Sequence, residues 1–447
     1  MNNLFRFTSL FQSLLLAVAL SSCSQMAHVQ APISSTPSDT ISLPSLPQSS
    51  SALVQAVLET PDVARSFAVA IAAQSQVAIA TTARATKVGL TGSTGLTGEN
   101  NRSTIGTATA TITANKPLYD NGQTDRSILL SALAAQSASL EAKIVADSAL
   151  QKVVEAYGTL ATAKQTVKII DHYLELYNAR EDLVKSAVQS NVLSNSDYLE
   201  LRSLKNQTLS ERAKSGLAIQ RSESSLKNTL GLNYTAAMSE LAKKYGQLKT
   251  PKFSAKRPVQ KELIDLRAAQ LNTQIKIQAA KNTPTANLQT SISETRSRNT
   301  GTIVFAGVAI TLPIKDGGEA AARIAYLSKE LEILEQDLEI LDQNILQARE
   351  NWENFGNYYQ TQKNLLLEQK SISSERIAES ELLLSAGRSS IKELAKEILA
   401  SAQTEIALIQ LKSEYLSQSL TATAVTSQTC ELFYLCELIQ IGIAENQ

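Results

Sequence analysis

The sequence predicts a mainly α-helical chain with a small β part, in which each of two long helical hairpins follows a β-hairpin. Three observations predict this fold class. A long stretch without proline carries apolar residues at alternating spacings of four and three, which is typical of a coiled-coil seam. Shorter stretches of strand-like sequence precede it, and the whole pattern occurs twice at an offset of 196 residues. The clearest seam consists of Leu327, Leu331, Leu334, Leu338, Leu341 and Ile345.

Two pairs of landmarks define the duplication. The segment from Pro117 to Gly122, with the sequence PLYDNG, is similar to PIKDGG from Pro313 to Gly318. The same offset relates Asn191 to Gly387, where the two helical patterns break. We therefore expect two helices of about 69 residues, each roughly 100 Å long. An internal repeat of this size determines the architecture of the chain.

The N-terminus has the features of a secreted, lipid-anchored protein. Residues 1–22 combine the positive charge of Arg6 with a short apolar stretch that is not long enough to span a bilayer. The residues before Cys23 are Leu20, Ser21 and Ser22, which resemble a bacterial lipobox. That resemblance implies cleavage before Cys23, a lipid on its sulfur and, since Asp does not follow the cysteine, an outer-membrane location. The alternative is an ordinary signal peptide with a chance cysteine. Residues 23–50 are rich in Ser, Pro and Thr and predict a flexible tether.

Composition argues against several classes of function. The formal net charge is zero, so no basic surface indicates a nucleic-acid partner. The chain has only two histidines, His28 and His172, and no cluster of metal-ligating residues is visible. Neither a Gly-x-Ser-x-Gly motif nor a phosphate-binding loop is present. We therefore expect a protein that is not an enzyme and has no cofactor.

The two repeats account for most of the chain. The first repeat, 51–258, is predicted to contain a helix to about residue 86, a β-hairpin over 87–117, a helical hairpin over 120–228 and an equatorial segment over 229–258. The second repeat, 259–425, is predicted to contain a helix, a β-hairpin over 286–313 and a helical hairpin over 316–425. A C-terminal tail follows over 426–447. Cys430 and Cys436 in this tail have two possible states, a disulfide or two free thiols.

A short turn is predicted between each β-hairpin and the long helix that follows it. Pro117 and Pro313 should end the strands, because proline cannot donate a hydrogen bond to the ladder. Asp120 and Asp316 should then cap the helices by accepting hydrogen bonds from free N–H groups. The turns finish at the equivalent glycines Gly122 and Gly318.

The four strands are too few for a closed structure in a membrane. Each is about ten residues long, the length at which a tilted strand crosses a bilayer. An open sheet edge in lipid would leave backbone groups unpaired, at several kcal/mol each. Other copies of the chain must therefore complete the sheet if it lies in lipid. The alternative is a pair of soluble hairpins that cap a coiled coil.

The order of hairpin, Pro-x-x-Asp-x-Gly, long helix, tip and return helix resembles the TolC-like outer membrane efflux protein family over residues 51–425. The resemblance implies a homotrimer with a twelve-stranded β-barrel, continued by an α-barrel across the periplasm of a Gram-negative bacterium. It also implies a periplasmic adaptor protein and an inner-membrane pump or ABC transporter as partners. The chain would then be a passive exit duct for drug efflux or type I secretion. The alternative is a structural or adhesive coiled-coil lipoprotein without a pore.

The candidate functional residues lie at the ends of the helical hairpins farthest from the strands. The tips should meet the adaptor, and a gate should lie just beyond them, where acidic side chains from three chains would form a ring. Lys396 occupies the position of a second acidic residue in the family, so it could weaken such a ring by pairing with Glu393. The predicted docking residues are Asn191, Val192, Leu193, Gly387, Arg388 and Ser389, and the predicted gate residues are Glu393, Lys396, Glu397 and Asp197.

Overall fold

The computed structural model describes residues 51–97, 105–245, 251, 258–296, 300–314, 316–386 and 390–432. These residues all belong to one compact unit, Pro44–Gln447. The segment Met1–Leu43 forms the other unit and lies outside the described residues, as does Cys23. The expected signal peptide, lipid anchor and tether therefore remain predictions.

The elements of the first repeat follow the predicted order. After the short helix α2 (Ala52–Leu58) come α3 (Pro61–Thr81) and the 3-10 turn η1 (Thr82–Arg84). The strands β1 (Lys87–Thr97) and β2 (Ile105–Tyr119) lead into α4 (Gln123–Gln189), which α5 (Asn195–Leu230) follows. Gly231 ends α5 with a φ of 53°, as expected for a C-terminal glycine cap. The repeat closes with η2 (Gly231–Asn233) and α6 (Tyr234–Tyr245).

The second repeat has the same order. Helix α7 (Val259–Ala280) precedes β3 (Thr285–Arg296) and β4 (Thr300–Thr311), and these lead into α8 (Glu319–Ser385) and its return helix α9 (Ile391–Ala424). Both α4 and α8 contain 67 residues, and both their first and last residues are 196 positions apart. The lengths agree closely with those predicted from the landmarks at the turns.

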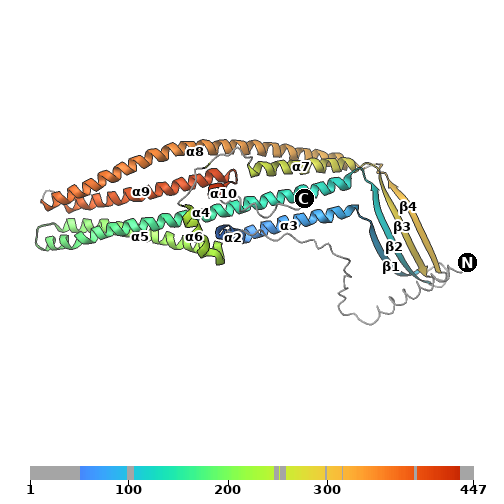
Figure 1. The fold of residues 1–447 in the computed structure, drawn as a ribbon, viewed down its shortest axis with the longest axis horizontal. Coiled ribbons are helices and arrows are strands. Elements are labelled where there is room, and N and C mark those ends of the chain that lie inside the picture. Colours follow the sequence, from blue (N-terminus) through green and yellow to red (C-terminus); the bar gives the residue numbers. More distant parts are fainter. Residues whose placement is uncertain are drawn as a thin grey trace, which may run out of the picture. The chain divides into compact units, whose positions relative to one another are not determined.

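Helix α4 lies at the centre of the helical layer. It packs against α3, α5, α7 and α9, while α7 also packs against α8. Figure 1 shows α5 running back beside α4 and α9 running back beside α8. Gly158 allows the close approach of α4 to α9, because a Cβ atom at this position would lie 2.6 Å from Cδ2 of Leu416.

The main core lies where the short helices meet the middle of α4. It combines buried residues from α2, α3, α4, α5, α6 and α9. Helix α2 is almost wholly buried, and Leu53 at its start is 0% exposed. Glu240 of α6 holds this helix by accepting hydrogen bonds from Ser51 Oγ (2.7 Å) and from the backbone N–H of Leu53 (3.1 Å). Helix α2, which directly follows the predicted tether over 23–50, is thus attached to the helical layer.

The strands form one antiparallel sheet in the order β1-β2-β3-β4. Pairing of β2 with β3 joins the two repeats, and β1 and β4 are the edges. The prediction that Pro117 ends its strand was wrong, because β2 continues to Tyr119. The register shifts between Pro117 and Tyr119, and a proline is compatible with a strand at such a bulge because one residue leaves the ladder there. The second hairpin behaves as expected, since β4 ends at Thr311, before Pro313.

Part of the predicted C-terminal tail is an ordered, buried segment. A short helix, α10 (Thr429–Leu432), follows α9, and Asp147 of α4 accepts hydrogen bonds from the backbone N–H groups of Thr429 (3.2 Å) and Cys430 (3.0 Å). Burial raises the pKa of the Asp147 carboxyl group above its ordinary value, although these hydrogen bonds oppose the shift. Cys430 is disulfide-bonded, and Cys436 lies outside the described residues.

Candidate functional site: an amphipathic sheet and the helical tips

One face of the four-stranded sheet is apolar across its full width. The strand registers place Leu90, Ile112, Ile292 and Val304 in a single row, one residue from each strand. All four side chains are exposed, from 41% at Ile112 to 73% at Leu90. Further apolar residues on the same face of the second hairpin extend this surface at Leu288, Val308 and Ile310. A soluble sheet buries such a face against a core, so this face requires an apolar environment outside the chain.

The opposite face of the sheet is largely polar over β1, β2 and β3, whereas β4 places the exposed side chains of Ile303 and Phe305 on it. Residues on this face alternate with those of the apolar row, as the pleat of a strand demands. The hydroxyl groups of Thr109 and Thr295 lie 3.3 Å apart across β2 and β3, and those of Thr111 and Ser293 lie 3.1 Å apart. The sequence predicted a β-hairpin in each repeat, but it did not predict that the Thr residues of β2 lie beside the Ser and Thr residues of β3. The registers show that these residues form one polar surface.

The sheet has two free edges, and so does the helical layer. Neither β1 nor β4 pairs with a further strand within the described residues. Helices α3 and α8 occupy the matching edges of the layer and expose large apolar side chains. Two helical segments, Pro61–Arg84 at the edge and Gln123–Gln189 of the central α4, each contain a stretch that is long and apolar enough to cross a membrane by length and composition alone. Only 17% of the first stretch and 28% of the second is buried. Large apolar side chains that are exposed on these two edge helices include those of Val69, Ile79, Ile340 and Leu346.

Both strand-to-helix turns are held by an aspartate, as predicted. Asp120 accepts hydrogen bonds from the backbone N–H groups of Gly122 (2.9 Å) and Thr124 (2.7 Å). Asp316 makes the equivalent bonds with Gly318 (2.9 Å) and Ala320 (3.1 Å). The glycines take left-handed conformations, with φ of 74° at Gly122 and 89° at Gly318. A side chain would be strained at either position.

The two aspartates differ in their surroundings. The amide of Asn282, next to the end of α7, donates a hydrogen bond of 2.8 Å to Asp316 Oδ2. This bond and those from Gly318 and Ala320 lower the pKa of Asp316 to about 2. Desolvation raises the pKa of Asp120, but the hydrogen bonds from Thr124 and Gly122 outweigh it and lower the pKa below the ordinary value. Both carboxylates are therefore ionised at neutral pH and stabilise the starts of α4 and α8.

The first tip makes a tight turn, as the sequence predicted. Asn191 has a φ of 58°, a left-handed conformation that Asn tolerates. The N–H groups of Val192 (2.9 Å) and Leu193 (3.2 Å) both donate hydrogen bonds to the carbonyl of Ala187 at the end of α4. Val192 is 75% exposed. The corresponding residues of the second tip, Gly387, Arg388 and Ser389, lie outside the described residues.

The predicted gate residues Glu393 and Asp197 occupy equivalent positions in helix caps. Ser390 and Glu393 form a capping box, in which each side chain accepts a hydrogen bond from the backbone N–H of the other residue, at 3.2 and 3.3 Å. At the first tip, Ser194 Oγ accepts from the N–H of Asp197 (3.2 Å) and donates to its carboxylate (2.9 Å). Local helix capping therefore explains an acidic residue at both positions without a gate.

The other two gate candidates have different surroundings. Lys396 is exposed. Glu397 forms an ion pair of 3.7 Å with Arg376 of α8, so part of its charge is already neutralised. Near the same end, Lys392 of α9 pairs with Glu200 of α5 at 3.9 Å. The structure therefore brings charges from both helical hairpins together close to the tips.

A buried interface that sequence analysis missed joins the two helical hairpins. Tyr177 of α4 is 0% exposed and donates a hydrogen bond of 2.8 Å to the carbonyl of Ala395 in α9. The hydroxyl of Tyr173 lies 2.6 Å from Ser401 Oγ, and Arg180 pairs with Glu381 of α8. Burial raises the pKa of both tyrosines. A buried tyrosine needs a partner for its hydroxyl group. The signal in the sequence was therefore Tyr177 itself, a polar aromatic residue within a long helix that is otherwise rich in alanine and leucine.

Comparison with known structures establishes the fold. The chain is similar to the outer membrane protein VceC from Vibrio cholerae, with 15% identity and a TM-score of 0.70 over 84% of this chain and 95% of that one. It is similar to the CmeC outer membrane channel of Campylobacter jejuni, with 12% identity and a TM-score of 0.71 over 87% and 88% of the two chains. The open state of the MtrE outer membrane channel of Neisseria gonorrhoeae matches with 14% identity and a TM-score of 0.68 over 84% and 88%.

Comparison by sequence adds no further assignment. No protein-family model matches the chain, and no curated protein matches it. The structural matches nevertheless extend over 84% and 87% of the chain. The fold that the sequence resemblance implied, long helical hairpins combined with a small antiparallel sheet, is therefore confirmed.

Proposed function

We propose that the chain is one subunit of an outer membrane exit duct, which passively conducts cargo from the periplasm to the exterior. The observation that carries this proposal is the sheet itself, with an exposed apolar row across one face, a polar surface over β1, β2 and β3 on the other and two free edges. A transmembrane barrel places apolar residues toward lipid and polar residues toward an aqueous interior. The shared fold with outer membrane channels supports the same conclusion.

Three copies of the chain form the duct in this proposal. A closed barrel removes the edges that four strands leave unpaired in lipid. Pairing of β4 from one copy with β1 of the next also brings the exposed edge helices α8 and α3 together, so one arrangement covers both the strand edges and the apolar helix surfaces. Contacts of this head-to-tail kind close into rings. The number three comes from the resemblance to the TolC-like family.

The tips of the helical hairpins receive the cargo. Helices α4 and α8 place them about 100 Å from the strand-to-helix turns, which is far enough to reach deep into the periplasm. A periplasmic adaptor and an inner-membrane pump or ABC transporter would deliver cargo there, for drug efflux or for type I secretion. Val192 is the exposed apolar contact at the first tip. Val192→Asp should reduce export in cells without changing the amount of oligomer in the outer membrane, and normal export would contradict docking at this tip.

A lipid on Cys23 would provide an additional anchor. The predicted tether of 28 residues, 23–50, has a root-mean-square reach of about 30 Å as a flexible chain. Helix α3 leads from the attachment point at α2 toward the sheet, and its 21 residues span about 32 Å. Because 28 residues span up to about 90 Å when fully extended, a chain of this length can cover the distance along α3. Mass spectrometry should find an acylated Cys23 at the mature N-terminus, and a free thiol there would contradict the anchor.

Two neighbouring positions on β3 test the duct directly. Ile292→Arg puts a charge on the apolar face, where it would cost about 2–4 kcal/mol near the middle of the bilayer, so we expect loss of the oligomer from the outer membrane. Ser293→Arg places the same side chain on the polar face, and we expect assembly with an altered single-channel conductance in planar bilayers. Equal tolerance of both variants, or an oligomer without any conductance, would favour the coiled-coil lipoprotein without a pore.

Glu393 needs an experiment that separates a gate from a helix cap. Glu393→Gln removes the charge and keeps an acceptor for the Ser390 N–H, whereas Glu393→Ala removes both. If the carboxylate belongs to a ring of axial charges, both variants should raise the conductance of the closed state and weaken cation selectivity. A change in Glu393→Ala alone would assign the residue to the cap. Asp197→Asn makes the matching comparison at the first tip.

A further inference from the structure

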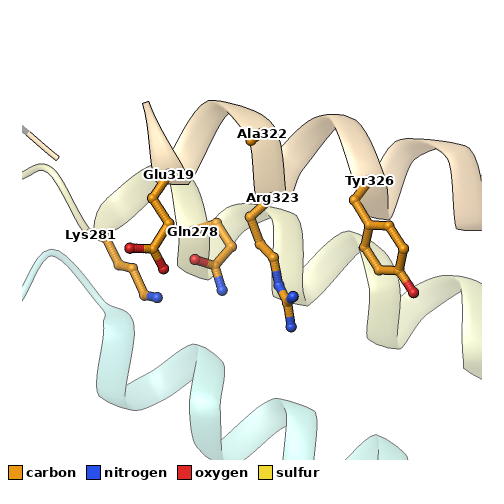
Figure 2. A pocket seen from close by; sticks show the side chains of 6 residues that line it. All are labelled: Gln278, Lys281, Glu319, Ala322, Arg323 and Tyr326. Atoms are coloured by element: carbon orange, nitrogen blue, oxygen red, sulfur yellow. The ribbon is translucent and has the colours of Figure 1, made fainter. Parts of the chain in front are cut away.

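A hollow of about 510 Å³ lies between the end of α7 and the beginning of α8, close to the sheet. Figure 2 shows its long side chains extending across the groove between the two helices. Its volume falls within the roughly 300–1,000 Å³ that is usual for sites of small organic ligands. The residues that line it are Gln278 from α7, Lys281 directly after α7, and Glu319, Ala322, Arg323 and Tyr326 from α8.

The charged groups of this hollow form no ion pairs within the described residues. Within the described part of the chain, neither Lys281 nor Arg323 takes part in an ion pair, and Glu319 is likewise unpaired. The lining therefore carries two positive charges and one negative charge, a net charge of one positive unit. An unpaired guanidinium and an unpaired ammonium in one hollow are suited to an anionic group such as a carboxylate.

A second hollow in the same groove provides a contrast. It measures about 400 Å³ and contains Arg267 and Gln270 from α7. Here the polar side chains are already occupied, because Arg267 pairs with Glu141 at 2.7 Å and Gln270 donates to Ser137 Oγ at 2.6 Å. The two hollows thus differ in whether their positively charged side chains already have partners. Only the hollow near the sheet, of these two, retains positive charges without partners.

An aromatic ring forms one wall of the first hollow and is held in place. The hydroxyl of Tyr326 donates a hydrogen bond to Glu330, one turn farther along α8. The guanidinium carbon of Arg323 lies 5.7 Å from the centre of the Tyr326 ring, which is within the range of a cation–π contact. The same ring also presents a flat apolar surface on which a planar ligand can stack.

We propose that this hollow is a binding site for a small organic anion with a flat aromatic body. Arg323 and Lys281 hold the anionic group, Tyr326 stacks on the ring, and Glu319 moderates the affinity by repelling the anion. Moderate affinity suits a conduit, because cargo must also leave. This inference rests on the proposed function in one respect, which is that the ligand is cargo passing through the duct.

The test uses naphthoate as the probe and the purified, assembled full-length protein in detergent. Isothermal titration calorimetry should show saturable binding of naphthoate and much weaker binding of the neutral analogue naphthamide. Arg323→Gln should weaken naphthoate binding roughly tenfold, because a charge-assisted hydrogen bond is lost. Glu319→Gln should tighten it roughly threefold, since an exposed repulsive charge is removed. Tyr326→Leu should reduce the preference for naphthoate over acetate.

Arg267→Gln in the second hollow is the matched control and should leave binding unchanged. Equal effects of Arg267→Gln and Arg323→Gln, or a Glu319→Gln variant that binds more weakly, would overturn the site. A separate measurement tests the cargo role, because naphthoate should reduce single-channel current in wild type and not in Arg323→Gln. Binding without any such reduction would overturn the cargo role, whereas a protein that forms no channel at all would instead contradict the proposed function.

Discussion

The packing of α4 against α9 makes a specific prediction at Gly158. A Cβ atom built there lies 2.6 Å from Leu416 Cδ2 and 3.8 Å from Tyr245. Optimal carbon–carbon contacts are about 3.5–4.0 Å, so Gly158→Ala requires the buried Leu416 side chain to move by about an ångström. Leu416 is only 4% exposed and cannot turn outward. The added methyl group should therefore disturb the interface between the two helical hairpins.

Two opposing effects determine the magnitude. Replacing Gly with Ala in a helix interior stabilises the folded state by about 1 kcal/mol. Overpacking of a filled core costs about 1–3 kcal/mol, so Gly158→Ala should lie between neutral and about 2 kcal/mol destabilising. Gly216 in α5 has nothing within 4 Å of its Cβ position. Gly216→Ala therefore retains only the favourable effect of about 1 kcal/mol.

Thermal unfolding of the purified protein in detergent, followed by circular dichroism, measures this difference. We expect a lower midpoint for Gly158→Ala than for Gly216→Ala, with Gly356→Ala behaving like Gly216→Ala because its Cβ position is also open. Leu416→Val removes the methyl group that clashes, so it should recover part of the loss when combined with Gly158→Ala. Stabilisation of equal size at all three glycines would refute the close-packing argument.

Further predictions concern single side chains. Asp316→Ala should lower the unfolding midpoint more than Asp316→Asn, because the amide keeps an acceptor for the N–H groups at the start of α8. Burial makes the pKa of Asp147 higher in the folded state than in the unfolded chain, so wild type should lose stability relative to Asp147→Asn as the pH rises above about 3.8, and urea unfolding at several pH values would detect this loss. Tyr177→Phe should destabilise the chain by about 1 kcal/mol and increase hydrogen exchange in the first turns of α9, around Ala395. Unchanged exchange there would show that Tyr177 does not join the two helical hairpins.

Much of the fold was predictable because its determinants are local and repeated. The seven-residue spacing of apolar residues defines long helices wherever it occurs, and the equivalent sequences around Asp120 and Asp316 mark where they begin. The asparagine at position 191 and the glycine at 231 mark where helices end, because few other residues adopt their conformations. Pro117 shows the limit of such reasoning, since a proline stops a strand only where the ladder has no bulge to accommodate it.

The candidate site was predictable only in part. Local patterns located the tips and identified Glu393 and Asp197, but they could not distinguish an axial charge from a cap. That distinction depends on the backbone geometry around Ser390 and Ser194. The hydrogen bond from Tyr177 to Ala395 joins residues more than two hundred positions apart. A sequence pattern carries no information on which distant carbonyl group faces a given hydroxyl.

The sequence by itself determined the order, length and duplication of the elements, because helix and strand periods and turn residues act over a few neighbouring positions. Only the tertiary structure decided how these elements combine. The registers align Leu90, Ile112, Ile292 and Val304 on one face of the sheet, and the packing leaves charges unpaired at Lys281 and Arg323 while it neutralises Arg267. Such outcomes arise from contacts between segments far apart in the chain, where each pairing depends on all the others.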